Sequence, residues 1–301
     1  MPDAENTETD HVREDPVGAM LGVLDLSTGV ARTTEDIFTG RSQHMPLGRV
    51  YGGQVLAQSV VAAQRTISPE RTVHSMHGYF LRPGDATKGI TFSVDRIHDG
   101  RSFATRRTQA FQDGVPIFSM IASFQDEDPG VEHQEPMPEG LPAPEDIPDV
   151  DEMTGDVNPI SRRMFSEQPI ELRHIPSPIY VSAGEERQPR QAVWMRTRRP
   201  IGDDAGLHRA VMAYLSDMTI QESILRAHGI AWVTPGLRVA SLDHAMWWHR
   251  PARVDEWLLY VQHSPNARGG RGLATGRIYT RDGVLVASVA QEIMVRVPSG
   301  D

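Results

Sequence analysis

The chain contains no cysteine, and it carries fewer basic than acidic residues. The absence of Cys excludes disulfides, thiolate nucleophiles and thiolate metal sites. Its 30 Lys and Arg residues against 40 Asp and Glu residues give a net charge of -10. Nucleic acid is therefore not an expected partner, because phosphate binding requires a clustered basic face.

A long apolar run is also missing. No stretch of about 18 consecutive apolar residues occurs, so the sequence predicts no transmembrane helix and no membrane span. Residues 1–17 start with the acidic string MPDAENTETDHVREDP, which lacks the apolar region of a signal peptide. We expect a disordered polar tail over residues 1–17 and a cytoplasmic protein.

The remaining chain divides into two compact segments joined by a region rich in proline and acidic residues. Its 301 residues suit two fused domains of about 130 residues each. We place the domains at residues 18–125 and 169–301. Residues 126–168 are predicted to be a linker, with a short helix over 160–165, because their composition buries little apolar surface.

The two compact segments look like copies of one unit. The pair Arg82-Pro83 recurs as Arg250-Pro251, and a second marker, Asp113-Gly114, recurs as Asp282-Gly283. The two separations agree to within one position. Two markers in the same order and at nearly the same separation indicate an internal duplication rather than chance dipeptides.

Each copy begins with a helical pattern that precedes its strand-like segments. The helices are predicted over 52–66 and 206–229, and Gly229 suits the C-terminal cap of the second. Apolar residues recur at helical spacing in the second helix: Leu207, Val211, Tyr214, Leu215, Met218 and Leu225. The segments that follow alternate in polarity and are divided by turn signals, which predicts antiparallel hairpins. The expected class is α+β, with each unit an antiparallel sheet wrapped around a central helix.

Several long strings resemble the acyl-CoA thioesterase II family. In the first half these are GRVYGGQVLAQSVVAAQRTI, VHSMHGYFLRPGD and VEHQEPMP, and in the second half AYLSDMT, ASLDHAMWWHRP, DEWLLY and DGVLVASVAQE. The resemblance implies a double hot-dog fold and hydrolysis of acyl-CoA as substrate. We expect no cofactor. The resemblance also implies a water-activating set that falls on Asp217, Ser241 and Gln291. Bacterial members often have Thr where this chain has Ser241, and the hydroxyl is kept.

The residues themselves favour water as the nucleophile. The chain has no Cys and no Gly-x-Ser-x-Gly elbow, so covalent catalysis has little support. Asp217 would accept the proton of the water or orient it, while Ser241 and Gln291 fix its position. A mid-helix Asp217 alone would also fit a solvated residue. Gln291 lies in an apolar row of the last strand, where a buried amide needs partners, either for function or for the fold.

The duplication predicts one active site per chain. By the two markers, Ser241 corresponds to Val73 and Gln291 corresponds to Ala122, and the helix over 52–66 contains no acidic residue. The first half therefore lacks all three polar groups, and the site is built on second-half residues. We expect the first half to supply part of the pocket wall.

Gly52 and Gly53, at the start of the first helix, are candidate substrate-binding residues. Their N–H groups can face an oxyanion or a phosphate, although a plain tight turn would use the same residues. Arg268 and Arg271 are candidate contacts for the CoA phosphates, and a solvated hairpin is the alternative. No metal is expected, because zinc needs three or four converging ligands. Two histidine pairs have no evident further ligands: His74 and His77, and His244 and His249.

Two competing functions remain for this sequence. A hot-dog enoyl-CoA hydratase typically pairs an Asp with a His five positions later, but Glu222 stands at that position after Asp217. The alternative is a non-catalytic or weakly active acyl-CoA-binding protein, against which the complete polar set argues. We also expect a homodimer or a larger symmetric homo-oligomer, because open sheet edges and apolar helix surfaces favour association.

Overall fold

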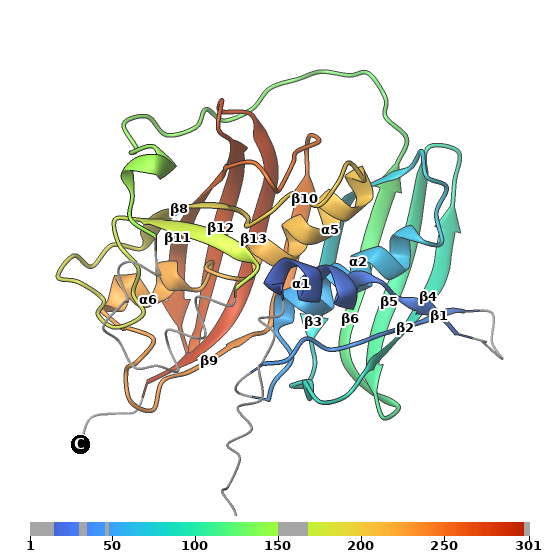
Figure 1. Cartoon of the computed structure of the whole chain (residues 1–301), viewed down its shortest axis with the longest axis horizontal. Helices are drawn as coiled ribbons and strands as arrows, with labels where there is room; N and C mark the ends of the chain where they lie inside the picture. The colour runs from blue at the N-terminus through green and yellow to red at the C-terminus, as the bar shows by residue number, and fades with distance from the viewer. Residues whose placement is uncertain (1–14, 30–34, 46–47, 150–167, 298–301) are drawn as a thin grey trace, which may run out of the picture.

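A computed structural model describes residues 15–29, 35–45, 48–149 and 168–297. These residues form one antiparallel sheet of 13 strands, with helices against one of its faces (Figure 1). The first unit comprises α1 Pro16–Leu24, β1 Ser27–Thr28, β2 Asp36–Gly40, α2 Gly52–Gln64, β3 Thr72–Phe80, β4 Ile90–Asp99, β5 Phe103–Gln112 and β6 Val115–Gln125. The 3-10 turn η1 (Pro144–Asp146) follows. The second unit comprises β7 Ile170–Ile175, β8 Arg190–Thr197, α5 Ala205–Ser216, α6 Glu222–His228, β9 Arg238–Ser241, β10 Asp243–Trp248, β11 Leu258–Arg268, β12 Arg271–Thr280 and β13 Leu285–Arg296.

The sheet is continuous across the two units. Its strand order is β1-β2-β4-β5-β6-β3-β10-β13-β12-β11-β8-β7, and β9 pairs with β13. The units meet where β3 pairs antiparallel with β10, and Ala245 lies opposite His77 in that pair. By the Arg-Pro marker these two residues are counterparts in the repeat, so a local two-fold axis relates the units there. The predicted double hot-dog architecture is confirmed.

The two central helices pack against each other at the middle of the sheet. Helix α2 of the first unit contacts α5 of the second, and α1 packs on α2 (Figure 1). Leu56, Ala57 and Val60 of α2 have no exposed surface. Burial of a Leu or Val side chain stabilises a fold by about 1.5–3 kcal/mol. One apolar cluster therefore runs through both units and holds α2 and α5 in fixed relative positions.

Two predicted boundaries differ from the structure. Pro16 and Val17, assigned to the tail, form the first turn of α1, because Asp15 caps this helix and Val17 is buried. The predicted helix over 206–229 is two helices, α5 and α6, separated by residues 217–221. Asp217 is consequently the C-terminal cap of α5 rather than a mid-helix residue. The predicted cap at Gly229 is confirmed, with a left-handed φ of 65°.

The described part of the predicted linker, residues 126–149, packs on the sheet of the second unit. Ile147 is buried in a small cluster with Trp194 and Tyr279, and Met137 lies against it. The indole N–H of Trp194 donates to the carbonyl oxygen of Pro142 at 3.0 Å. The few apolar residues between the prolines thus suffice to attach this segment. Residues 150–167, including the helix predicted over 160–165, lie outside the described residues. Within the described part of the chain, no helix is long and apolar enough to cross a membrane.

Candidate functional site

The structure brings Asp217, Ser241 and Gln291 together from three different elements. Asp217 caps α5, Ser241 ends β9 and Gln291 lies on the inner face of β13. The Gln291 Nε2 group donates to Asp217 Oδ1 at 2.8 Å and to Ser241 Oγ at 2.7 Å. Ser241 Oγ donates in turn to Asp217 Oδ1 at 3.1 Å. The three side chains therefore form a closed ring of hydrogen bonds that fixes one carboxylate oxygen.

The pairing of strands explains why these residues converge. In β13, Val289, Gln291 and Ile293 alternate toward the buried face, as the period-two pattern predicts. Strand β9 pairs with the end of β13 so that Ser241 lies opposite Ile293, one step from Gln291 on the same face. Gln291 has no exposed surface and Asp217 is 3% exposed, whereas Ser241 is only partly buried. Access from solvent is thus on the Ser241 side.

The N-terminus of α2, from the first unit, reaches the same carboxylate. A Cβ atom at Gly52 would lie 2.7 Å from Asp217 Oδ2 and 3.2 Å from the Phe80 ring, so any larger residue there would have to displace the carboxylate. The backbone N–H of Gly53 hydrogen-bonds to the Asp217 carboxylate. A helix N-terminus favours negative charge at this place. The two predicted glycines therefore face the carboxylate, and the site lies between the units.

Burial dominates the electrostatics of Asp217. It raises the pKa of Asp217 to about 6, because the charged form loses its hydration. Hydrogen bonds from Gln291, Ser241 and the Gly53 backbone N–H favour the carboxylate and limit the rise. A carboxylate with a pKa near 6 is ionised at neutral pH and is a stronger base than an ordinary Asp.

Two tyrosines, Tyr51, which is partly buried, and Tyr260, which is buried, hold the last turn of α5, which carries Asp217. The hydroxyl of Tyr51 donates to the carbonyl oxygen of Tyr214 at 2.8 Å, and that of Tyr260 donates to the carbonyl oxygen of Ser216 at 3.1 Å. The last carbonyls of a helix lack partners within it, and these hydroxyls supply them. Burial, followed by the Asp217 charge, raises the pKa of Tyr51 and of Tyr260, so both hydroxyls remain donors.

The side chains of two buried glutamines hold the turn between α5 and α6. The Gln262 Nε2 group donates to Thr219 Oγ1 at 2.6 Å, and the Gln191 Nε2 group donates to the Thr219 carbonyl oxygen at 3.1 Å. Gln191 Nε2 also lies 3.1 Å from Glu222 Oε2. These bonds take the place of helical ones over residues 217–221. They are the physical reason why the apolar periodicity of α5 continues into α6 while the backbone helix does not.

His244 also belongs to this cluster, although its sequence position did not indicate a place in the site. Its Nδ1 atom contacts Gln291 Oε1, and its Nε2 atom lies 2.9 Å from Ser216 Oγ. Burial lowers the pKa of His244 to about 4, so the imidazole is neutral at ordinary pH. The alternation of His244, Met246 and Trp248 along β10 was the available signal, because it places all three on the buried face.

The two arginines predicted for CoA binding are not brought to this cluster. Arg271 is exposed on the opposite face of the sheet from Gln291, and its Nε atom lies 2.9 Å from Glu292 Oε1. Arg268 lies opposite Arg271 at the β11–β12 hairpin. Their contact with CoA remains a prediction. Among the described residues, no three His, Asp or Glu side chains converge as a metal site would require.

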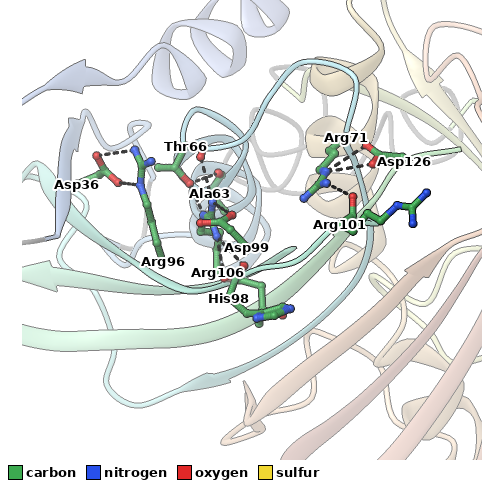
Figure 2. A network of polar contacts seen from close by, with 11 residues as sticks. Asp36, Ala63, Thr66, Arg71, Arg96, His98, Asp99, Arg101, Arg106 and Asp126 are labelled. Carbon is green, nitrogen blue, oxygen red and sulfur yellow. Dashed lines mark hydrogen bonds and ion pairs between the residues drawn. The ribbon is translucent and has the colours of Figure 1, made fainter. Parts of the chain in front are cut away.

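An arginine network occupies the far end of α2. Arg106 of β5 is 2% exposed, and its guanidinium donates to Thr66 Oγ1 at 2.8 Å and to Asp99 Oδ1 at 2.6 Å (Figure 2). The adjoining hollow, of about 450 Å³, is also lined by Arg71 and Arg96, each paired with an aspartate. The 13 residues of α2 separate this network from Gly52 by about 20 Å. It stabilises the helix C-terminus rather than the site.

Comparison with known proteins agrees with this architecture. Residues 166–294 match the family described as acyl-CoA thioesterase, and residues 41–125 match the acyl-CoA thioesterase N-terminal domain. Acyl-coenzyme A thioesterase 8 of Homo sapiens is 38% identical over 95% of this chain and 92% of its own length. Acyl-CoA thioesterase 2 of Haemophilus influenzae is 36% identical over 86% of this chain and 92% of its own length.

Solved structures give the same result. Acyl-CoA thioesterase II TesB2 from Mycobacterium marinum is 40% identical with a TM-score of 0.72, covering 94% of this chain and 99% of that one. The tesB protein of Mycobacterium avium subs paratuberculosis is 31% identical with a TM-score of 0.75, covering 93% and 100%. A hot-dog protein from Alicyclobacillus acidocaldarius, 18% identical with a TM-score of 0.72, shares the fold. The chain therefore belongs to the acyl-CoA thioesterase family, whose members are thioester hydrolases.

Proposed function

We propose that the protein hydrolyses fatty acyl-CoA to a free fatty acid and CoA, by direct attack of a water molecule held by Asp217, Ser241 and Gln291. The observation that carries the proposal is the closed ring of hydrogen bonds on Asp217 Oδ1. It leaves Oδ2 facing the start of α2, with no side chain of the described residues donating to it. That oxygen is free to accept a hydrogen bond from water.

The reaction then proceeds by addition and elimination. Asp217 takes a proton from the water while the water oxygen bonds to the thioester carbonyl carbon. The carbon–sulfur bond then breaks, and the proton moves from Asp217 to the departing CoA thiolate. Ser241 and Gln291 remain unchanged. Gln291 donates to Asp217 and Ser241 and so keeps the carboxylate and the hydroxyl oxygen, which accept from the water, in line. No acyl group is transferred to the protein at any stage.

The first turn of α2 stabilises the developing oxyanion in this proposal. The N–H groups of Gly52 and Gly53 lie at a helix N-terminus, where the helix dipole favours negative charge. When Asp217 becomes protonated, its hydrogen bond with the Gly53 N–H weakens. At the same moment negative charge appears on the substrate oxygen, which can then accept from that N–H. The Gly53 N–H thus serves the carboxylate first and, together with the Gly52 N–H, the tetrahedral intermediate afterwards.

One active site per chain is expected. The positions of Ser241 and Gln291 are occupied in the first unit by Val73 and Ala122, which are both buried. An apolar pair offers water neither a donor nor an acceptor. We further expect the enzyme to act in the cytoplasm, as a homodimer or larger homo-oligomer, and without a cofactor.

The proposal is tested by assaying release of free CoA from a series of acyl-CoAs of rising chain length. Wild-type protein should release CoA from at least one member of the series, and Gln291→Ala should do so much more slowly at a temperature where the variant is fully folded. Tight binding of acyl-CoA without release of CoA would instead support the alternative, a binding protein without catalysis. Wild-type rates in Gln291→Ala would contradict the assigned water site.

A further inference from the structure

We propose that His244 is a positioning residue that orients the Gln291 side-chain amide, so that both Nε2 hydrogens point at Asp217 and Ser241. This inference rests on the proposed function, because it assigns the group that aligns the water-holding ring. His244 does not reach the reacting atoms itself. Its contacts are with Gln291 and with Ser216 at the end of α5.

The atoms in contact fix which imidazole nitrogen carries the proton. Gln291 Nε2 already donates to Asp217 Oδ1 and to Ser241 Oγ, so the amide oxygen is the atom that faces His244. An amide oxygen only accepts hydrogen bonds, and therefore Nδ1 of His244 carries a hydrogen. In the neutral imidazole Nε2 is then an acceptor, 2.9 Å from Ser216 Oγ. The single hydrogen of the Ser216 hydroxyl can be donated either to this nitrogen or to the carbonyl oxygen of Ala213, which is also 2.9 Å away.

The reversed amide would be disfavoured at both ends. With Gln291 turned over, its N–H groups would face the N–H of His244, and its oxygen would face the carboxylate of Asp217. A buried donor or acceptor without a partner is unfavourable, because it has lost its hydrogen bonds to water and gained none in the protein. The Asp217 carboxylate and the Nδ1–H of His244 therefore favour the same amide orientation from opposite ends, whereas the apolar walls around Gln291 would accept either orientation equally.

The first unit supplies an internal control for a purely structural role. By the Arg-Pro marker, the position equivalent to His244 is Met76, which is 3% exposed. Met76 lies opposite Ala122, the counterpart of Gln291, in the β3–β6 pair. The register of β10 and β13, continued by one step from Ala245 and Ala290, likewise sets His244 opposite Gln291. The fold thus accepts a methionine–alanine pair at this place, and a buried imidazole, which is costly to desolvate, is not needed for it.

The polar residues of the site occur together in one unit and are absent together from the other. Val73, Met76 and Ala122 stand where the second unit has Ser241, His244 and Gln291. His244 therefore follows the presence of the water-holding residues rather than the presence of the strand. A role in orienting Gln291 accounts for that pattern, because His244 has nothing to orient where Gln291 is replaced by alanine.

The inference is tested with His244→Met, which introduces the residue that the first unit carries. We expect kcat to fall about 10- to 100-fold, the range measured for groups that orient metal ligands. KM and the melting temperature should change little. His244→Asn should recover part of the lost kcat, because the Asn amide N–H can replace the Nδ1–H donor. His249→Asn, whose partner Ser288 lies outside the site, is the matched control and should behave as wild type.

A double-mutant cycle separates orientation from a general structural effect. The double variant His244→Met, Gln291→Ala reproduces the pair of the first unit, and its kcat should equal that of Gln291→Ala alone. Additive losses, or a wild-type kcat in His244→Met, would overturn the inference. Asp217→Asn distinguishes the two proposals: if it is inactive while His244→Met is active, only the His244 role fails. If Asp217→Asn turns over normally, the proposed function itself fails.

Discussion

Replacement of Asp217 by Asn is expected to lower activity and raise stability together. The carboxylate is 3% exposed, and its pKa is raised from the ordinary 3.8 to about 6 by burial. At about 1.36 kcal/mol for each pKa unit, the ionised group costs the folded state about 3 kcal/mol at neutral pH. Asn is neutral and nearly isosteric, so that cost disappears.

Part of the gain is offset by the new amide group. Its oxygen can still accept from Ser241 and Gln291, but its N–H groups then face the Gly53 N–H at the start of α2. We expect a net stabilisation of about 1–2 kcal/mol, after about 1 kcal/mol is lost with that hydrogen bond. The proposed catalytic base is lost entirely. Loss of general-base catalysis typically costs about 10²–10⁴-fold in kcat, and KM should change little.

The experiment combines a thermal melt with an assay of CoA release. Asp255→Asn is the matched control, because the Asp255 side chain is only 5% exposed and its carboxylate serves the fold through an ion pair with Arg253. Burial alone would raise the pKa of Asp255, but hydrogen bonds from Arg253 and the Ile201 N–H hold it below its ordinary value. That variant should lose stability and keep its kcat. An Asp217→Asn protein that melts early yet turns over normally at low temperature would refute the catalytic role.

Three further predictions concern the site, and a fourth concerns the assembly of the protein. Ser241→Thr should keep substantial activity because the hydroxyl persists, whereas Ser241→Ala should lower kcat more than it raises KM; a wild-type kcat in the Ala variant would remove the hydroxyl from the site. Gly52→Ala should lower kcat at least as much as Asp217→Asn, since its Cβ would displace Asp217 Oδ2, and full activity there would contradict the described geometry. The wild-type kcat should rise with pH through about 6, where Asp217 ionises, and a flat rate profile would exclude Asp217 as base. The free energy of unfolding should fall as the pH rises from about 4 to 6, because the carboxyl ionises in the unfolded chain while it still holds its proton in the folded one. Light scattering should give a particle larger than the 33.4 kDa chain, and a monomer at micromolar concentration would refute the predicted homo-oligomer.

The family resemblance supplied the three site residues, and the duplication was the strongest information about the fold that the residues themselves carried. Two short markers, separated from their copies by nearly equal lengths of chain, predicted two like units. The pairing of His77 with Ala245 places the symmetry axis between counterparts of that repeat. The alternation in β13 likewise predicted the buried position of Gln291. Periodicity succeeds here because it reports which face of an element is buried, which local sequence determines.

The remaining features depend on contacts between distant residues. The break after α5 arises from Gln191 and Gln262, which hold Thr219 from two strands. The role of Gly53 requires knowing that α2 points at the second unit. His244 was considered only as half of a metal pair, because its partner Gln291 is 47 residues away. Such side-chain partnerships leave no periodic signal, and only the folded chain brings them together.

The central claim is that water attacks the thioester directly, and a single turnover in oxygen-18 water tests it most directly. With enzyme in excess over acyl-CoA, the fatty acid should carry one heavy oxygen, and intact-protein mass measured during turnover should show no acyl adduct. The protein recovered afterwards should contain no heavy oxygen. An acyl group on Ser241, or oxygen-18 in the carboxylate of Asp217, would show a covalent intermediate and contradict the account.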